Sequence, residues 1–204
     1  KSEHLSLYPD FSFFYKKLSK WLNVNSNELY LNEGVSGLVK SIMESYCQPG
    51  RSNFIVPFPT FAMYEIYSKM YDLKLKKYKY NKDYKLDFNS LLKLVDKNTS
   101  LIIIPNPNVP IEGIINLDQI EKIIKICKKN KIMLVMDEVY FPFSSVNSLN
   151  LFNKYKENYI ILRSFSKAFG MAGIRLGYAI SSKKNINYIA KTRGGYETNN
   201  LSVI

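Results

Sequence analysis

From residue 27 onward, short apolar runs alternate with longer segments whose apolar residues recur at helical spacing. The apolar runs, which we expect to form buried strands, cover residues 29–31, 53–56, 73–78, 101–104, 132–136, 159–162 and 176–180. The segments that we expect to form amphipathic helices cover residues 37–46, 61–70, 88–95 and 117–128. Strands that are apolar throughout are typical of a mostly parallel sheet covered on both faces. The pattern therefore predicts an α/β fold with three layers, αβα.

Residues 1–26 stand outside this alternation, with a helix predicted over residues 15–22 and a lead-in strap over residues 5–9. We therefore divide the chain into an N-terminal segment, 1–26, and a large domain, 27–204. No apolar run approaches the roughly 20 residues that a helix needs to cross a bilayer, and there is no signal-peptide pattern. These features predict a cytoplasmic protein without a membrane partner.

The composition excludes several kinds of site. One histidine, His4, and two cysteines, Cys47 and Cys127, are too few for a His-rich or four-cysteine zinc site, so we expect no metal. The net charge of +12 raises the possibility of nucleic-acid binding. The lysines, however, fall mostly on the polar positions of segments that are otherwise rich in Leu and Ile, as on a solvated helix face. We therefore expect no nucleic-acid partner.

The strongest concentration of functional groups follows the run 159–162. Lys167 comes after two hydroxyl residues, Ser164 and Ser166, and before Arg175. The two hydroxyls and the planar guanidinium could bind a phosphate together. Lys167 beside them is then a candidate nucleophilic amine of the kind that forms a Schiff base.

Three other strand ends carry candidate ligand groups. Asp137 follows the run 132–136, where a buried acid requires a cationic partner. The loop after residue 104 presents Asn108, and residues 34–37 link a strand to a helix whose first N–H groups are free to bind phosphate. Each feature alone has an ordinary structural explanation, as a cap, a rigid turn or a surface lysine. Because ligands of such sheets bind beyond the carboxyl ends of the strands, the four together indicate one shared site.

Residues 164–178 follow, almost position for position, the lysine signature of the pyridoxal-phosphate enzymes with the aspartate-aminotransferase fold. Over residues 27–178 the chain resembles this family, and most closely the branch of histidinol-phosphate aminotransferases and threonine-phosphate decarboxylases. The resemblance implies that Lys167 carries pyridoxal 5'-phosphate as a Schiff base and later moves the α-proton of the substrate. It also implies that Asp137 pairs with the pyridine nitrogen and that Tyr140 bonds the phenolic oxygen.

The same resemblance implies the remaining contacts to the cofactor. Phe61 takes the position of the aromatic ring that stacks on the pyridine, and Asn108 presents an amide. The cofactor phosphate would be held by five residues, namely Val35, Ser36, Ser164, Ser166 and Arg175.

The sequence departs from the family pattern at three positions and in its length. In the loop 108–113, Val109 replaces an Asn, and an extra residue precedes the glycine. Ser36 stands where the branch usually has an acid, and Phe61 is commonly Tyr. The small C-terminal domain, with the arginine that binds the substrate carboxylate, is not evident, and Arg193 does not match that arginine.

The resemblance implies an aminotransferase that moves an amino group between a small amino acid, with or without a phosphate, and a 2-oxo acid. Two alternatives remain open at this point. One is a decarboxylase of a phosphorylated amino acid on the same scaffold, and the other is a fragment that keeps the fold without turnover. Enzymes of this kind are usually homodimers, which we expect here as well.

Overall fold

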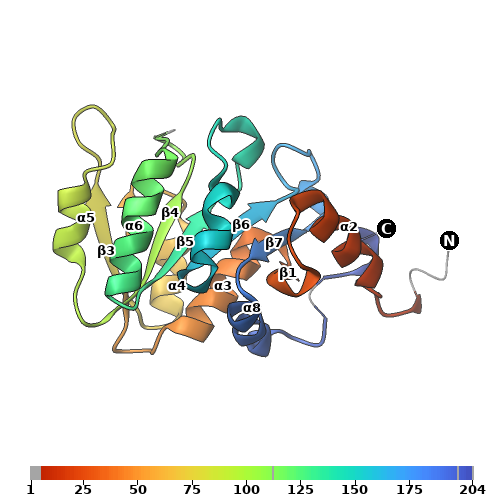
Figure 1. The fold of residues 1–204 in the computed structure, drawn as a ribbon. Coiled ribbons are helices and arrows are strands. Elements are labelled where there is room, and N and C mark those ends of the chain that lie inside the picture. The colour runs from red at the N-terminus through yellow and green to blue at the C-terminus, as the bar shows by residue number, and fades with distance from the viewer. Residues whose placement is uncertain (1–5, 112, 197, 204) are drawn as a thin grey trace.

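The computed structural model describes residues 6–111, 113–196 and 198–203, so His4 lies outside the described residues. Across this part of the chain, seven strands form one sheet in the order β1-β7-β6-β5-β4-β2-β3 (Figure 1). The strands are β1 (Leu29–Asn32), β2 (Asn53–Phe58), β3 (Lys74–Lys79), β4 (Thr99–Pro105), β5 (Met133–Asp137), β6 (Tyr159–Ser164) and β7 (Gly177–Ile180). Neighbours from β3 to β6 are parallel, whereas β7 is antiparallel to both β6 and β1. The predicted α/β fold with a mostly parallel sheet is confirmed.

Helices cover both faces of this sheet. One face carries α2 (Ser12–Leu22), α5 (Phe88–Leu94), α6 (Leu117–Lys129) and α7 (Phe152–Tyr155), and the other carries α3 (Gly34–Tyr46), α4 (Met63–Met70) and α8 (Lys183–Ile189). The short 3-10 helices are η1 (Ser26–Glu28), η2 (Phe141–Phe143), η3 (Ser148–Leu151), η4 (Lys156–Asn158), η5 (Ala172–Ile174), η6 (Ala190–Thr192) and η7 (Asn200–Ser202). Two separate buried clusters, one on each face, complete the predicted three layers.

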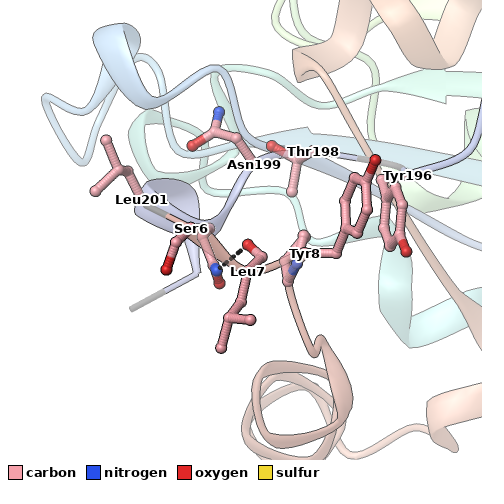
Figure 2. Close-up of a pocket in the computed structure, with 9 residues that line it drawn as sticks. Ser6, Leu7, Tyr8, Tyr196, Thr198, Asn199 and Leu201 are labelled. Carbon is pink, nitrogen blue, oxygen red and sulfur yellow. Dashed lines mark hydrogen bonds between the residues drawn. The ribbon is translucent and has the colours of Figure 1, made fainter. Parts of the chain in front are cut away.

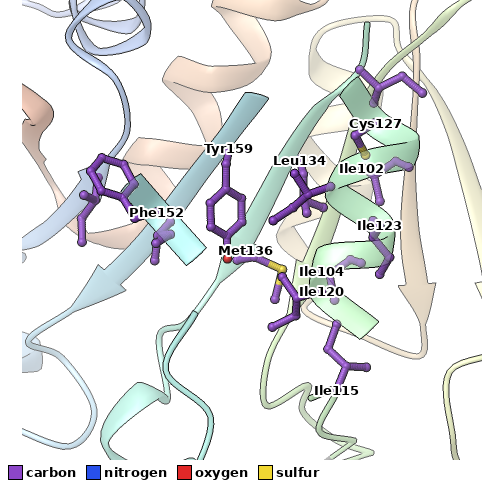
Figure 3. Packing of buried hydrophobic residues seen from close by; sticks show 14 of the residues in the cluster. Ile102, Ile104, Ile115, Ile120, Ile123, Cys127, Leu134, Met136, Phe152 and Tyr159 are labelled. Carbon is purple, nitrogen blue, oxygen red and sulfur yellow. The ribbon is translucent and has the colours of Figure 1, made fainter. Parts of the chain in front are cut away.

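Helix α6 shows how the sequence builds one of these layers (Figure 3). Asn116 caps its first turn through a reciprocal pair of bonds with Gln119, which supplies partners for N–H groups that a helix leaves free. The apolar stripe of α6, which includes Ile120 and Ile123, is fully buried against side chains of β4 and β5 such as Leu134. Burial of each such side chain stabilises the fold by about 1.5 to 3 kcal/mol.

The structure corrects the predicted elements at several points. The strand over residues 73–78 was expected to be buried, but β3 lies at the sheet edge with Lys74, Lys77 and Lys79 exposed. A strand that pairs on one side only can keep lysines in water. Helix α3 begins at Gly34, three residues before the predicted start at Gly37. Helix α8 was not predicted.

Residues 6–9 of the N-terminal strap run beside the last described residues, where both help to line a surface cavity (Figure 2). The rings of Tyr8 and Tyr196 stack with centroids 4.4 Å apart, and the Asn200 amide donates to the Leu7 carbonyl at 3.0 Å. The division into segments 1–26 and 27–204 stays a prediction. None of the helices in the described ranges combines the length and the apolar character that a membrane span requires.

Two glycines bring the strand ends together where the candidate residues lie. A Cβ atom on Gly177, the first residue of β7, would lie 2.8 Å from the carbonyl carbon of Gly34. Glycine at position 177 therefore lets β7 approach the turn between β1 and α3. Because β7 is antiparallel to β6, its start lies beside the end of β6, where Ser164 pairs with Gly177. The turn into α3 thus meets the segment after β6 at the edge of the sheet that is formed by the carboxyl ends of its parallel strands.

Candidate active site

A cavity of about 330 Å³ opens at this edge, beyond the carboxyl ends of the parallel strands. Its wall contains every residue that the sequence singled out for the cofactor or for catalysis: Val35, Ser36, Phe61, Asn108, Asp137, Tyr140, Ser164, Ser166, Lys167 and Arg175. These residues come from five separate segments of the chain, so their meeting is a result of the fold. The structure brings the predicted set together, and the role of each member stays a prediction.

Lys167 places an exposed primary amine at this cavity. It lies in the turn after β6, which is closed by a bond from the Gly170 N–H to the Lys167 carbonyl at 3.0 Å. Gly170 has a φ of +67°, a conformation that favours glycine. The Lys167 ammonium lies 5.6 Å from the centroid of the Tyr140 ring. An amine and a phenol from two different strand ends therefore face the same space.

One side of the cavity has the chemistry of an anion site. The first turn of α3 supplies Ser36 and backbone N–H groups, and the segment after β6 supplies Arg175 and Ser166. A guanidinium, hydroxyls and a helix N-terminus are donors that suit a phosphate. The Arg175 Nη2 atom contacts the Glu33 carbonyl at 3.4 Å, and a Cβ atom on Gly34 would lie 2.8 Å from Nη2. Glycine at position 34 therefore leaves room for the guanidinium beside the helix.

Asp137, the last residue of β5, is a buried carboxylate with 3% of its surface exposed. The Tyr64 hydroxyl donates to its Oδ2 at 2.6 Å and the Val139 N–H donates to its Oδ1 at 3.1 Å. Burial, with a smaller contribution from the charge of Glu138, raises the pKa of Asp137 to about 6, although the two hydrogen bonds lower it. Both donors are neutral, so the cationic partner expected from the sequence does not come from either of them.

Asn108 and Phe61 reach the cavity in different ways. Asn108 is fully buried, and its amide is already bonded: the Thr60 hydroxyl donates to Oδ1 at 2.7 Å, and Nδ2 donates to the Pro59 carbonyl at 2.9 Å. The neighbouring Val109 also lines the cavity and is 43% exposed. Phe61 is equally exposed, and its ring meets that of Tyr64 edge to face, with centroids 5.7 Å apart. Phe61 thus has an open aromatic face, whereas the Asn108 amide is used within the protein.

The sequence profile of the aminotransferase class I and II family matches residues 1–201. The chain belongs to this aminotransferase family.

Its relatives include the histidinol-phosphate aminotransferase of Thermoanaerobacter pseudethanolicus, which is 32% identical over 207 aligned residues. That alignment covers 100% of this chain and 58% of the relative, so the chain spans little more than half the length of the relative.

Two solved structures share the aminotransferase fold seen here. The histidinol-phosphate aminotransferase of Sinorhizobium meliloti, solved in complex with pyridoxal-5'-phosphate, superposes with a TM-score of 0.86 at 21% identity. It matches 99% of this chain and 55% of its own. The L-threonine-O-3-phosphate decarboxylase of Porphyromonas gingivalis gives a TM-score of 0.78 at 23% identity, over 96% of this chain and 60% of its own.

Sequence reasoning missed Tyr64, whose hydroxyl donates a hydrogen bond to Asp137. Tyr64 lies three residues after Phe61, within the first turn of α4, so its spacing from a predicted site residue was the available signal.

Sequence reasoning also missed the buried ion pair of Glu138 and Arg163, each of which adjoins a predicted site residue in sequence. No sequence signal pairs the two residues, because the ends of β5 and β6 meet only in the fold. Among the described residues, no cluster of three or more His, Cys, Asp or Glu side chains could hold a metal ion.

Proposed function

We propose that this chain is the cofactor-binding part of a pyridoxal 5'-phosphate-dependent aminotransferase. The observation that carries the proposal is the meeting, in one cavity, of an accessible lysine amine, a buried carboxylate and a set of phosphate donors. A cofactor with an aldehyde, a pyridine nitrogen and a phosphate needs these three partners. The family of the chain supports the same assignment.

The residues present fit this cofactor. Lys167 can bond its aldehyde carbon, and the first turn of α3 with Arg175 and Ser166 can hold its phosphate. The buried Asp137 carboxylate, held by neutral donors, can pair with a protonated pyridine nitrogen. Phe61 offers its open ring face at the same cavity. The three attachment points come from different elements, so together they would fix both the position and the tilt of the ring.

When bound, the cofactor supplies an electron sink that stabilises negative charge at the α-carbon of the substrate. The Lys167 amine, at the same cavity, would take the proton from that carbon and return it at another. Asp137 favours the protonated pyridine nitrogen because a buried carboxylate stabilises a positive charge close by. Tyr140, which faces Lys167, would donate a hydrogen bond from its hydroxyl to the phenolic oxygen of the cofactor.

We further propose that the amino donor carries a phosphate and that a 2-oxo acid accepts the amino group. Support comes from the relatives that match nearly the whole of this chain and are named histidinol-phosphate aminotransferases. Histidinol phosphate is therefore the first donor to test. We also propose that the protein is a homodimer, as the enzymes that it resembles usually are. Light scattering after gel filtration measures this oligomeric state. The cytoplasmic location stays a prediction.

Absorbance of the purified chain with added pyridoxal 5'-phosphate tests the proposal. We expect a visible band of protein-bound cofactor that Lys167→Ala abolishes, because the amine that bonds the aldehyde is lost. Lys122→Ala, on an exposed position of α6, is the matched control and should keep the band. A wild-type chain without a band would contradict the proposal and favour a non-catalytic fragment.

The shared fold of the threonine-phosphate decarboxylase keeps a decarboxylase as the second candidate. The two activities differ in the bond broken at the α-carbon, and a half-reaction separates them. Conversion of the cofactor to its amine form with the donor alone supports amino transfer. Release of CO₂ without a 2-oxo acid supports decarboxylation instead.

A further inference from the structure

A buried ion pair lies directly behind the candidate active site. Glu138 follows the last residue of β5, and Arg163 is the residue before the end of β6. The two strands are parallel neighbours, and the Glu138 N–H donates to the Leu162 carbonyl at 2.8 Å. Because successive side chains of a strand point to opposite faces, Arg163 points away from the face to which Ser164 points. Each member of the pair thus adjoins a cavity residue, Asp137 or Ser164.

The contacts of this pair are short and nearly complete. Arg163 donates through Nε at 3.0 Å and through Nη2 at 2.8 Å, both to Oε2 of Glu138. The other carboxylate oxygen accepts the Ser148 N–H at 3.1 Å, and Nη2 also donates to the Asn147 amide oxygen at 2.7 Å. Glu138 is 1% exposed and Arg163 is 3% exposed. With so little exposed surface, the two charges are only weakly screened by water, so the position of one strongly constrains the other.

The same guanidinium also packs on the segment that carries Tyr140. Its central carbon lies 3.5 Å from the ring centroid of Phe141, the residue after Tyr140. Together with the contacts to Asn147 and Ser148, this stacking ties both ends of the segment between β5 and η3 to strand β6. Strand β6 leads directly into the turn that carries Lys167. One ion pair therefore connects the two segments that place the phenol and the amine.

Stability alone does not account for such a pair. Well-packed apolar side chains of similar volume often stabilise a core as much as a buried ion pair or more. What an ion pair adds is directional bonding, which specifies how one segment lies against another. Here the segments specified are those of Tyr140 and Lys167.

We propose that Glu138 and Arg163 are positioning residues that fix the Tyr140 segment against the Lys167 turn and thereby set the orientation of the bound cofactor. This inference rests on the proposed binding of pyridoxal 5'-phosphate. Neither residue lines the cavity, so both act through their neighbours. Their loss should change how the cofactor is held in a chain that is still folded.

Arg163→Gly tests this by chemical rescue. A second, partly open cavity of about 470 Å³ is lined by Arg163, Asn147 and Phe141, and it offers a route by which free guanidinium can reach Glu138. We expect the variant to bind pyridoxal 5'-phosphate about tenfold more weakly, as for a small misplacement of binding groups, and to show altered visible circular dichroism. Guanidinium chloride at millimolar concentration should restore both, whereas sodium chloride at the same concentration should not.

Two further variants keep the test decisive. Arg163→Lys retains the charge but cannot donate from two fixed nitrogens to Oε2 of Glu138, so it should also alter the visible circular dichroism below its unfolding temperature. If Arg163→Gly does not fold, this variant decides the outcome. Lys156→Gln is the matched control, since it breaks the 2.8 Å ion pair to Glu28 at the opposite end of β6 and should leave the spectrum unchanged.

The outcomes separate this inference from the proposed function. If the wild-type chain binds the cofactor and the folded Arg163 variants keep its affinity and spectrum, the pair is only structural and the inference is wrong. If the wild-type chain shows no bound cofactor, both the proposed function and this inference are overturned.

Discussion

Asp137 and Glu138 are consecutive buried carboxylates with opposite surroundings. Asp137 meets a hydroxyl and a backbone N–H, whereas Glu138 meets the guanidinium of Arg163. The pKa of Asp137 is raised to about 6, so ionising this residue opposes folding above that pH. The charge of Glu138 is compensated within the chain. The difference teaches that a buried acid held by neutral donors can still pair with a cationic group of a ligand. A buried acid that is already paired with an arginine instead holds two segments of the protein together.

The largest change should follow from breaking the paired side. Glu138→Gln leaves the Arg163 guanidinium buried without a counter-charge, which we expect to lower the free energy of unfolding by about 3 to 5 kcal/mol. Urea unfolding measures this. Lys77→Gln is the control, because it breaks a 2.7 Å ion pair whose two members are 36% and 45% exposed. That variant should unfold nearly as the wild type does. Equal losses in the two variants would show that burial is not what distinguishes these pairs.

Removing the unpaired acid should have the opposite sign. The difference between about 6 and the ordinary 3.8 means that ionised Asp137 costs about 3 kcal/mol, at about 1.4 kcal/mol per pH unit. Asp137 binds its proton more tightly in the folded chain than in the unfolded chain. The stability that this contributes is fully present below about pH 4 and is lost as the pH rises through about 6. Asp137→Asn should therefore stabilise the cofactor-free chain by about 2 to 3 kcal/mol at pH 8, while weakening cofactor binding.

The measurement for Asp137→Asn is urea unfolding of the cofactor-free chain at pH 4 and at pH 8. Wild type and variant should differ much less at the lower pH, where Asp137 is protonated in the folded chain and still about half protonated in the unfolded chain. A variant that is less stable than the wild type at pH 8 would contradict the raised pKa of Asp137.

The smallest of the three effects concerns Tyr64. Tyr64→Phe removes the hydroxyl that bonds Asp137 at 2.6 Å, which should cost about 2 kcal/mol at pH 8, as for a hydrogen bond to a charged group. Because that bond lowers the pKa of Asp137, its loss should move the pKa above about 6. The fall in stability with rising pH, which begins near the ordinary pKa of 3.8, should then continue to a higher pH. An unchanged pH dependence would mean that Tyr64 does not stabilise the carboxylate.

Most of the fold could be predicted because its signals are local. All seven predicted strands are present, and the apolar stripes of α3 and α6 are buried as their spacing indicates. The exposure of β3 could not be predicted, since the order of strands in a sheet depends on contacts between distant segments. Helix α8 was missed because its lysines and asparagines hide a short apolar face, whose Ile186 and Ile189 are buried.

The candidate site divides in the same way. Lys167 and Arg175 belong to one contiguous signature, so the sequence alone identified them. The bond from Tyr64 to Asp137 joins residues 73 positions apart, and the contact of Glu138 with Arg163 crosses from one strand to the next. Such pairings follow from the register of β5 and β6 and from the packing of α4, which no single segment encodes.

The close approach of Gly177 to Gly34 has a consequence for the synthesis of the chain. The two sides of the anion site are far apart in sequence, since Arg175 and Glu33 are separated by 142 positions. Strand β7 is the last strand of the described chain, yet it lies between β1 and β6. In a nascent chain, Asp137 therefore emerges well before the two sides of the anion site can meet. The cofactor would then bind only after the whole sheet has left the ribosome and assembled.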